Sequence, residues 1–267
     1  MKKTFLYAAI IITAAIAAGA FTFYLLMPDA SEFKAKNPQK TSLMTHRELT
    51  WKAKGQKKIA AHRWAALPDI SPYLIKAVII SEDDRFWEHA GFDYGGMKEA
   101  MEKNLKSGKF RAGGSTISQQ LAKNLYLTPE RTFFRKIKEA VITWKMERTL
   151  AKRRILELYL NAVEWGDGVF GAEAASNFYF GKRASELTPI EAARLAATLP
   201  SPKRLNPAGD QPYLLNRAEI IHEIMVKRGI VAPEFEIENG DTPGESPVLT
   251  PPDAGAGNTP PTGPDAN

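Results

Sequence analysis

The longest apolar stretch of the chain lies near its N-terminus. An uncharged run of 24 residues, 4–27, follows Met1-Lys2-Lys3. About 20 apolar residues cross a bilayer as a helix, so the run predicts a transmembrane helix over 4–27, with residues 1–3 on the cytoplasmic side. Ala18-Gly19-Ala20 resembles a signal-peptide cleavage site, but the run is longer than the apolar core of most signal peptides. The pattern therefore favours an uncleaved anchor over a removed signal.

Helical periodicity dominates the middle of the chain. Apolar side chains recur every three or four positions over 135–150 and 153–163. Ser71-Pro72 is typical of an N-cap followed by a first-turn proline, and Thr188-Pro189-Ile190-Glu191 has the form of a capping box. No stretch offers several alternating strands in series. These patterns predict a mainly α domain over 65–238.

The last segment, 239–267, differs from the rest in composition. It contains seven prolines and five glycines but no aromatic residue, Lys or Arg. Such a segment cannot bury enough surface to fold, so it is predicted to be disordered. It holds four of the 30 acids, and the other 26 acids against 36 basic residues give the rest of the chain a net charge of +10. This charge fits an acidic partner or a membrane surface, or simply a well-solvated face.

Basic residues are concentrated directly after the apolar run. Between Phe33 and Trp64, nine lysines and arginines stand against a single acid, Glu48. The segment 28–64 is therefore predicted to be a basic juxtamembrane region near anionic headgroups. Because lysines lie on both sides of the apolar run, charge alone does not decide which side carries the main domain.

The chain has no cysteine, so a disulfide scaffold, a thiolate metal site and a cysteine nucleophile are excluded. Three adjacent acids, Glu82-Asp83-Asp84, follow the apolar run 77–80 after Ser81. Like-charge repulsion and burial raise the pKa of such a carboxyl group, which can then act as a general base near neutral pH. The alternative is a solvated acidic turn in which Arg85 pairs with Asp83 or Asp84. His89 either orients one of these acids or is structural.

A second candidate follows the flexible sequence Gly113-Gly114-Ser115. One face of the helix that it introduces carries a hydroxyl, three amides and an ammonium group, on Thr116, Gln119, Gln120, Lys123 and Asn124. Together with the N–H groups at the helix start, this polar stripe suits a phosphate or a sugar. The alternative is an ordinary solvent-facing stripe. The loop lacks the Walker A pattern, so nucleotide binding is not supported.

Cations precede Glu139 in a third candidate. Arg135 and Lys136 lie four and three residues before it. They either form ordinary ion pairs along a helix or clamp a pyrophosphate around one ionised carboxylate. A fourth pattern, with Glu157 and Asn161 one turn apart, favours buried polar pairing over catalysis.

Taken in order, these stretches resemble the peptidoglycan glycosyltransferase family, which also supplies the polymerase module of bifunctional penicillin-binding proteins. The chain is most similar to the monofunctional members, and the resemblance covers roughly residues 62–210. The matching residues are Glu82-Asp83, Phe86, His89, Gly91, Gly114-Ser115-Thr116-Ile117, Gln119-Gln120, Lys123-Asn124, Arg135-Lys136, Glu139, Ile155-Leu156-Glu157, Tyr159-Leu160-Asn161, Gly166 and the run 187–207.

The resemblance implies a mainly α, lysozyme-like glycosyltransferase domain behind a single N-terminal transmembrane helix, with a partly apolar subdomain near the membrane. It also implies polymerisation of lipid II. The 4-hydroxyl of the acceptor GlcNAc attacks the lipid-linked donor glycan, a β-1,4 bond forms with inversion, and undecaprenyl pyrophosphate leaves. No transpeptidase module follows the motifs, so the chain is expected to polymerise glycan without cross-linking it.

The resemblance also assigns roles. Glu82 is expected to be the general base, and Glu139 is expected to stabilise the reaction on the donor side. The expected substrate-binding residues are Asp83, Ser115, Thr116, Gln119, Gln120, Lys123, Asn124, Arg135 and Lys136. No tightly bound cofactor is expected. A divalent cation (Mg or Mn) at the pyrophosphate often assists family members, but the sequence shows no dedicated ligand set for one.

The expected partners are lipid II, the lipid-linked growing glycan, the membrane and other cell-wall synthesis or division proteins, but not nucleic acid. The expected location is the bacterial inner membrane, crossed once, with the catalytic domain on the periplasmic side. This placement would hold the catalytic groups beside the bilayer that retains the lipid tail of the substrate.

Two alternative functions stand beside this expectation. A lytic, lysozyme-like hydrolase also uses two carboxylates, but a neutral glycan does not require the cations Lys123, Arg135 and Lys136. A non-catalytic membrane scaffold for cell-wall proteins would leave the acids without a chemical role.

Overall fold

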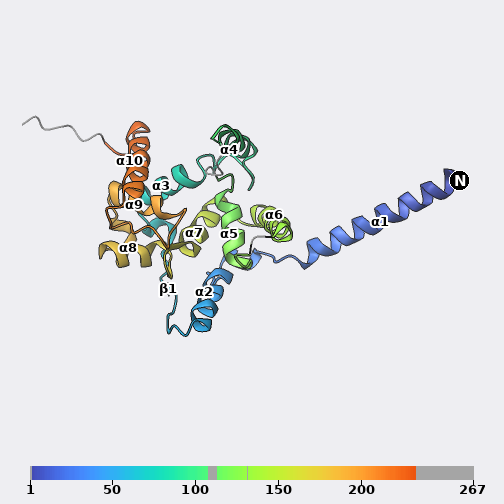
Figure 1. The fold of residues 1–267 in the computed structure, drawn as a ribbon, viewed down its shortest axis with the longest axis horizontal. Coiled ribbons are helices and arrows are strands. Elements are labelled where there is room, and N and C mark those ends of the chain that lie inside the picture. The colour runs from blue at the N-terminus through green and yellow to red at the C-terminus, as the bar shows by residue number, and fades with distance from the viewer. Residues whose placement is uncertain (1, 108–112, 131, 233–267) are drawn as a thin grey trace, which may run out of the picture. The chain divides into compact units, whose positions relative to one another are not determined.

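The computed structural model describes residues 2–107, 113–130 and 132–232, so the predicted tail over 239–267 lies outside it. The first element, α1 (Lys2–Leu26), is a helix of 25 residues with a mean hydropathy of 2.2 in its most apolar window. None of that window is buried, and the helix is long and apolar enough to cross a membrane (Figure 1). It is the single candidate span among the described residues, in agreement with the predicted anchor.

Helices form most of the described chain, as the periodicity predicts. After α1 they are α2 (Ser42–Ala53), α3 (Pro72–Glu82), α4 (Tyr94–Ser107), α5 (Ile117–Tyr126), α6 (Phe133–Thr149), α7 (Lys152–Ala162), α8 (Ala172–Phe180), α9 (Pro189–Thr198) and α10 (Pro212–Lys227). Short 3-10 turns are η1 (Ser31–Lys34), η2 (Leu67–Asp69) and η3 (Ala184–Glu186).

Two helix starts test the predicted capping signals. The hydroxyl of Thr188 accepts a hydrogen bond from the Glu191 N–H, and the Glu191 carboxylate accepts one from the Thr188 N–H, so the capping box is confirmed. Ser71 is the N-cap of α3, as predicted, but its hydroxyl donates to the Leu187 carbonyl at 2.9 Å instead of capping the helix. This bond ties the start of α3 to the segment that precedes α9.

Strands are few and short. β1 (Ala61–His62), β2 (Glu164–Gly166) and β3 (Val169–Phe170) form a sheet in the order β1-β3-β2. β1 runs parallel to β3, whereas β2 is antiparallel to it. Strands of two or three residues are too short to show an alternating pattern, which is why the sequence did not reveal them.

The basic segment 28–64 contributes to this sheet through β1. Arg47 also pairs with Glu164, and Lys58 pairs with Asp167, each at 2.5 Å. Two of the positive charges of the segment are therefore neutralised by acids of the fold, which leaves fewer of them to interact with anionic headgroups.

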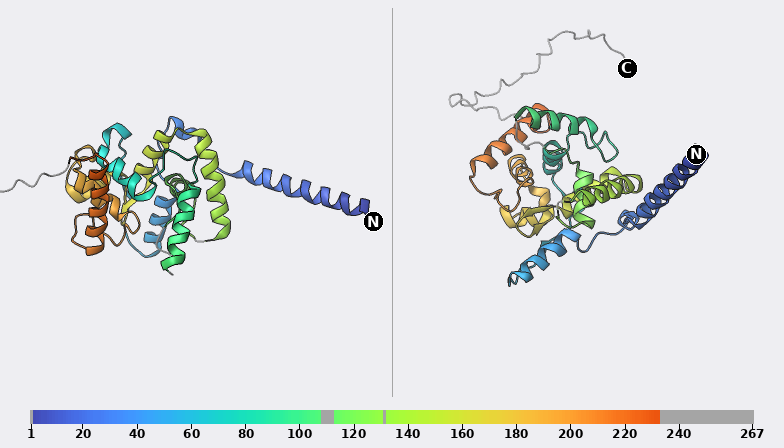
Figure 2. Two further views of the ribbon diagram at one scale, coloured as in Figure 1. Left: turned by 90° about the horizontal axis from the view of Figure 1, so that it is seen from above. Right: turned by 45° about the vertical axis from the view of Figure 1, so that its right-hand side comes forward.

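The core lies between two groups of helices. α9 packs on α10 and α3, whereas α5 packs on α6 and α7. In Figures 1 and 2, α3, α9 and α10 lie on one side of the described domain, α5 and α6 lie on the other, and α7 lies between them. The face predicted for 153–163 is buried here, with Ile155, Leu156, Tyr159 and Leu160 all at 0% exposure.

The helix α6 presents apolar side chains on two faces. The predicted helical pattern is confirmed, but Ile137 and Trp144 from that pattern are 38% and 44% exposed. The core-facing side instead carries Ile142, Met146 and the carboxylate residue Glu139. One face of α6 therefore leaves apolar side chains at the surface while the other buries an acid.

Candidate active site

Glu82 is the last residue of α3, where the helix ends against α5 and α10. Its side chain is 12% exposed. Oε2 accepts a hydrogen bond from Gln120 Nε2 at 2.9 Å, and Oε1 lies 3.8 Å from the guanidinium of Arg217. Burial raises the pKa of Glu82, with a further contribution from the negative charge of Asp83, whereas Gln120, Arg217 and Lys123 act in the opposite direction. The predicted candidate base is therefore a largely buried carboxyl group with a raised pKa.

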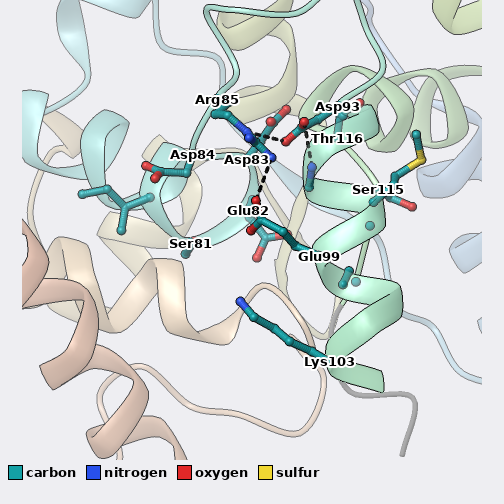
Figure 3. Close-up of a pocket in the computed structure, with 16 residues that line it drawn as sticks. Ser81, Glu82, Asp83, Asp84, Arg85, Asp93, Glu99, Lys103, Ser115 and Thr116 are labelled. Carbon is teal, nitrogen blue, oxygen red and sulfur yellow. Dashed lines mark hydrogen bonds and ion pairs between the residues drawn. The ribbon is translucent and has the colours of Figure 1, made fainter. Parts of the chain in front are cut away.

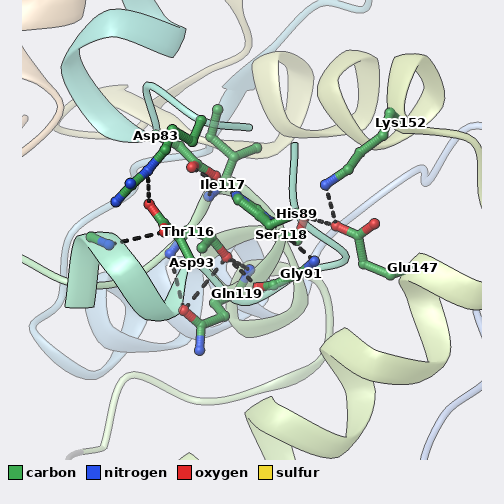
Figure 4. Close-up of polar contacts among 12 residues, drawn as sticks. Asp83, His89, Gly91, Asp93, Thr116, Ile117, Ser118, Gln119, Glu147 and Lys152 are labelled. Carbon is green, nitrogen blue, oxygen red and sulfur yellow. Dashed lines mark hydrogen bonds and ion pairs between the residues drawn. The ribbon is translucent and has the colours of Figure 1, made fainter. Parts of the chain in front are cut away.

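Asp83, the next residue, turns away from Glu82 and into the protein. Its Oδ2 accepts a hydrogen bond from the Ile117 N–H at 2.9 Å, and its Oδ1 lies 2.9 Å from His89 Nε2. Because His89 Nδ1 accepts from the Gly91 N–H, Nε2 carries the proton and donates to Asp83 (Figure 4). The hypothesis that His89 orients one of the acids is confirmed, and Asp83 fixes the first turn of α5.

Thr116 and Gln119 cap α5 and are buried. The Thr116 N–H donates to Gln119 Oε1 at 3.0 Å, and the Gln119 N–H donates to Thr116 Oγ1 at 3.2 Å. The Thr116 hydroxyl also donates to the Gly91 carbonyl at 2.7 Å (Figure 4). Two members of the predicted polar stripe therefore hold the helix start in place instead of facing solvent.

The remaining members of that stripe lie further along α5. Gln120 donates to Glu82 and accepts a hydrogen bond from the hydroxyl of Tyr159 at 3.2 Å, and Asn124 is buried. Lys123 interacts electrostatically with both Glu82 and Glu139. Burial is the main cause that lowers the pKa of Lys123, and the negative charge of Glu139 opposes it. This lysine therefore links the two candidate catalytic carboxylates electrostatically.

Glu139 lies on the buried face of α6 between two cations of its own helix. Its carboxylate accepts from Arg135 Nη1 at 2.8 Å and also pairs with Lys136. The Glu139 side chain is 4% exposed, whereas that of Lys136 is 48% exposed. Two positive charges thus compensate one buried carboxylate, and one of them remains accessible to a bound anion.

A cavity of about 460 Å³ opens beside Glu82 (Figure 3). Among the predicted site residues, it is lined by Glu82, Asp83, Ser115 and Thr116. The predicted residues that do not line it are Gln119, Gln120, Lys123, Asn124, Arg135, Lys136 and Glu139. Its opposite wall comes from α4, from which Lys103 extends toward the side on which Glu82 lies (Figure 3). The structure therefore divides the predicted residues between this cavity and the cation cluster around Glu139.

The alternative in which Arg85 pairs with Asp83 or Asp84 is wrong. Arg85 instead contacts Asp93 at 3.1 Å and Glu99 at 3.5 Å, across the cavity mouth (Figure 3). Asp83 is unavailable because both of its oxygens face α5 and His89, and Asp84 pairs with Arg228. Neither arrangement has a local sequence signal, because the partners come from other elements.

The pattern of Glu157 and Asn161 is structural, as favoured from the sequence. The side-chain amide of Asn161 bonds both the N–H and the carbonyl of Ala65, at 2.9 and 2.8 Å, and also donates to the Glu157 carbonyl. The Glu157 carboxylate, however, pairs with Arg154 and not with Asn161. Asn161 therefore holds α7 to the segment after β1.

Sequence reasoning missed Arg217 and the partly buried pair of Glu147 and Lys152. The Glu147 carboxylate accepts from Lys152 at 2.8 Å and from the Ser118 hydroxyl, close to Gly91 (Figure 4). These contacts join α5, α6 and α7, so no single stretch of sequence contains them.

A metal fits poorly in the described part of the molecule. The described residues contain no group of three His, Asp or Glu side chains that could hold an ion. Glu139, the acid nearest the cation cluster, is already paired with Arg135 and Lys136. A protein-held divalent ion is therefore not supported at this position.

Comparison with known proteins adds independent information. A model of the transglycosylase family matches residues 49–226. A biosynthetic peptidoglycan transglycosylase of Azoarcus sp. (strain BH72) is 50% identical over 179 residues, which cover 67% of this chain and 78% of the relative. Proteins of the same name are 54% identical over 168 residues in Aromatoleum aromaticum, covering 63% and 73% of the two chains, and 47% identical over 185 residues in Nitrosospira multiformis, covering 69% and 80%.

Proposed function

Because the chain belongs to the transglycosylase family, we propose that it is a peptidoglycan glycosyltransferase that polymerises lipid II into linear β-1,4 glycan strands. The observation that carries the proposal is the placement of Glu82: a buried carboxyl group with a raised pKa beside a cavity, electrostatically linked through Lys123 to a second carboxylate among cations. A base on one side and an anion-binding cluster on the other are the two requirements of this reaction.

In this proposal Glu82 takes the proton from the 4-hydroxyl of the acceptor sugar. The cavity beside it has room for a sugar, and burial strengthens the carboxylate as a base. As the proton moves to Glu82, the acceptor oxygen bonds to C1 of the donor sugar, and the bond from C1 to the pyrophosphate breaks. Attack from the face opposite the leaving group inverts C1.

Arg135, Lys136 and Lys123 would hold the undecaprenyl pyrophosphate that leaves. Charge-assisted hydrogen bonds from guanidinium and ammonium groups stabilise the negative charge that grows on this group. Glu139 pairs directly with Arg135 and Lys136, which suits the proposed role of orienting these cations on the donor side. A neutral glycan does not require such cations, which favours the polymerase over a hydrolase.

A divalent cation would have to be held mainly by the pyrophosphate oxygens, since the described residues supply no ligand cluster of their own. Mg and Mn both prefer oxygen ligands, including those of phosphates. The residues present instead meet the pyrophosphate with positive side chains.

The membrane anchor would hold the site at the lipid surface. Lys145 of α6 donates to the Met27 carbonyl at 2.6 Å, just after the apolar span, and the rings of Tyr24 and Trp144 lie 5.8 Å apart. The end of α1 therefore contacts the helix that carries the cation cluster. At the start of α6, Phe133 and Phe134 are 84% and 56% exposed and suit contact with lipid.

In this proposal α1 crosses the bacterial inner membrane once and the catalytic domain lies on the periplasmic side, beside the bilayer that holds the lipid tail of the substrate. Lipid II and the growing glycan are the proposed partners. Other cell-wall synthesis or division proteins remain an expectation from the family.

The test is conversion of labelled lipid II by the purified full-length chain, with preformed glycan as a parallel substrate. We expect lipid II to become longer polymer and preformed glycan to keep its length. Shortening of the preformed glycan without polymer would establish a hydrolase instead. Absence of turnover on both substrates by folded protein would favour the scaffold.

A further inference from the structure

The helix α10, which is distant in sequence but packs on α3, brings a cation to Glu82. Nη2 of Arg217 lies 3.8 Å from Glu82 Oε1 and donates a hydrogen bond to the Ser81 carbonyl at 3.3 Å. The residue is 136 positions from Ser81 in the chain, and its side chain is 30% exposed. The guanidinium is therefore held by the end of α3 and by Glu82. Its Nε atom is buried without a hydrogen-bond partner.

Contacts along its length and just beyond its end hold α10 in place. Its apolar face, formed by Leu214, Ala218, Ile221 and Met225, is buried against the core. Just beyond its end, Arg228 makes two hydrogen bonds to Asp84, at 2.6 and 2.8 Å. Two arginines of this segment are therefore attached to the residues on either side of Glu82 and Asp83, and they hold this acidic segment in place.

Several groups besides Arg217 face the Glu82 carboxyl. From its own segment, Asp83 adds a negative charge, and from α5, Gln120 donates a hydrogen bond while Lys123 adds a positive charge. From α7, the buried hydroxyl of Tyr159 donates to Gln120 and carries no charge at neutral pH. Arg217 and Lys123 are thus two cations that favour the ionised form of Glu82, whereas burial and Asp83 disfavour it. Arg217 lies near Oε1, and Gln120 bonds the other oxygen, Oε2.

We infer that Arg217 is a positioning residue for the reaction, which orients Oε1 of Glu82 toward the cavity and keeps the carboxylate ionised at the pH at which it must accept a proton. The inference rests on the proposed role of Glu82 as the base. A guanidinium within about 4–6 Å of a carboxyl group favours the charged form. Without it, burial acts with less opposition, and the base is available only at higher pH.

The test is the pH profile of kcat/KM for lipid II polymerisation by the full-length protein, compared for the wild type, Arg217→Gln and Arg217→Lys. The acid limb of the profile should move to higher pH in Arg217→Gln. The ratio of wild-type to variant turnover should then be about threefold to tenfold larger on the acid limb than on the plateau. Arg217→Lys keeps the charge and should restore the limb in part.

Lys227→Gln is the matched control, because it removes one positive charge from the same helix. Lys227 is exposed and pairs with Glu223, not with Glu82. Its acid limb should coincide with that of the wild type. A limb that stays in place in Arg217→Gln, with activity lowered equally at every pH, would reduce Arg217 to a structural contact and overturn the inference.

A second readout covers an Arg217→Gln variant whose turnover is too low to profile. The Tm of each background is measured against pH with and without Glu82→Gln, and the difference reports the ionisation of Glu82 in the folded state. In the Arg217→Gln background this difference should keep growing to a higher pH, and reach a larger value, than in the wild-type background; equal pH dependence would refute the inference. Failure of the wild type to polymerise lipid II would instead refute the proposed function.

Discussion

Oδ2 of Asp83 accepts the Ile117 N–H at 2.9 Å, so the residue next to the proposed base is bonded to the first turn of the helix that carries Gln120 and Lys123. A negative side chain at a helix N-terminus satisfies an N–H group and interacts favourably with the helix dipole. The same carboxylate accepts from His89 on its other oxygen. This side chain therefore helps to fix the relative position of α3 and α5, and with it the contact between Gln120 and Glu82.

Asp83→Ala should therefore reduce both stability and activity. It leaves the Ile117 N–H and the His89 N–H without their acceptor in a buried place, and we expect a loss of about 3 kcal/mol in the free energy of unfolding. Urea denaturation measures this loss. Asp84→Ala is the control, because its pair with Arg228 is about half exposed and is worth less than about 1 kcal/mol. Equal losses in the two variants would contradict the anchoring role of Asp83.

Gly91→Ala should disturb the packing around the start of α5, where the Gly91 carbonyl accepts a hydrogen bond from Thr116. Gly91 has a φ of +95°, and a Cβ there would lie 2.9 Å from Cγ of Glu147 and from Cγ2 of Thr143. Strain and crowding together should lower the free energy of unfolding by about 2–3 kcal/mol. At Gly55, where φ is +71° and nothing lies within 4 Å of the added Cβ, the loss should be about 1 kcal/mol. Thermal or urea unfolding of Gly91→Ala and Gly55→Ala compares the two, and a larger loss at Gly55 would refute the close packing beneath Gly91.

The raised pKa of Glu82 has a consequence for stability. A carboxyl group whose pKa is higher in the folded state stabilises the fold fully below its unfolded pKa, near 4.5, and this contribution is lost as the pH rises through the folded value. Glu82→Gln should therefore match the wild type near pH 4 and exceed its Tm by about 2–4 °C at pH 8. Glu88→Gln, at an exposed position of the same segment, should show no such pH-dependent gain. A Tm difference that is the same at both pH values would show that burial does not raise the pKa of Glu82.

The cation cluster should bind the leaving group. Lys136→Ala removes the accessible ammonium beside Glu139, and the inhibition constant of inorganic pyrophosphate in the polymerisation assay should rise about tenfold. Lys138→Ala is the matched control on the same helix, because Lys138 lies over the ring of Phe134, at 4.9 Å from its centre, and does not pair with Glu139. If both variants weaken inhibition equally, the effect is one of overall charge and not of this cluster.

Local patterns predicted much of this molecule because their partners are close in sequence. The capping box at Thr188 and the ion pairs between Glu139 and the two cations before it involve residues three or four apart, which is the spacing that a helix brings together. The long apolar run predicted α1 for a similar reason. Motif resemblance then supplied the order of the site residues along the chain.

Contacts between distant elements could not be predicted in the same way. Arg217 and Arg228 reach the acidic segment from α10, and Asp84 and Arg85 take partners that their immediate neighbours do not reveal. The Asp83 side chain points toward α5 and His89, which rules out the alternative pairing with Arg85. Such contacts depend on tertiary geometry, for which a single sequence carries no periodic signal.

The most direct test of the account compares lipid II polymerisation at neutral pH by the full-length wild type, Glu82→Gln and Glu88→Gln, with equal amounts of folded protein. Loss of a general base should slow Glu82→Gln by about 10²–10⁴-fold, whereas Glu88→Gln should polymerise as the wild type does. Polymerisation by Glu82→Gln at a rate close to that of Glu88→Gln would show that the buried carboxylate does not take the proton.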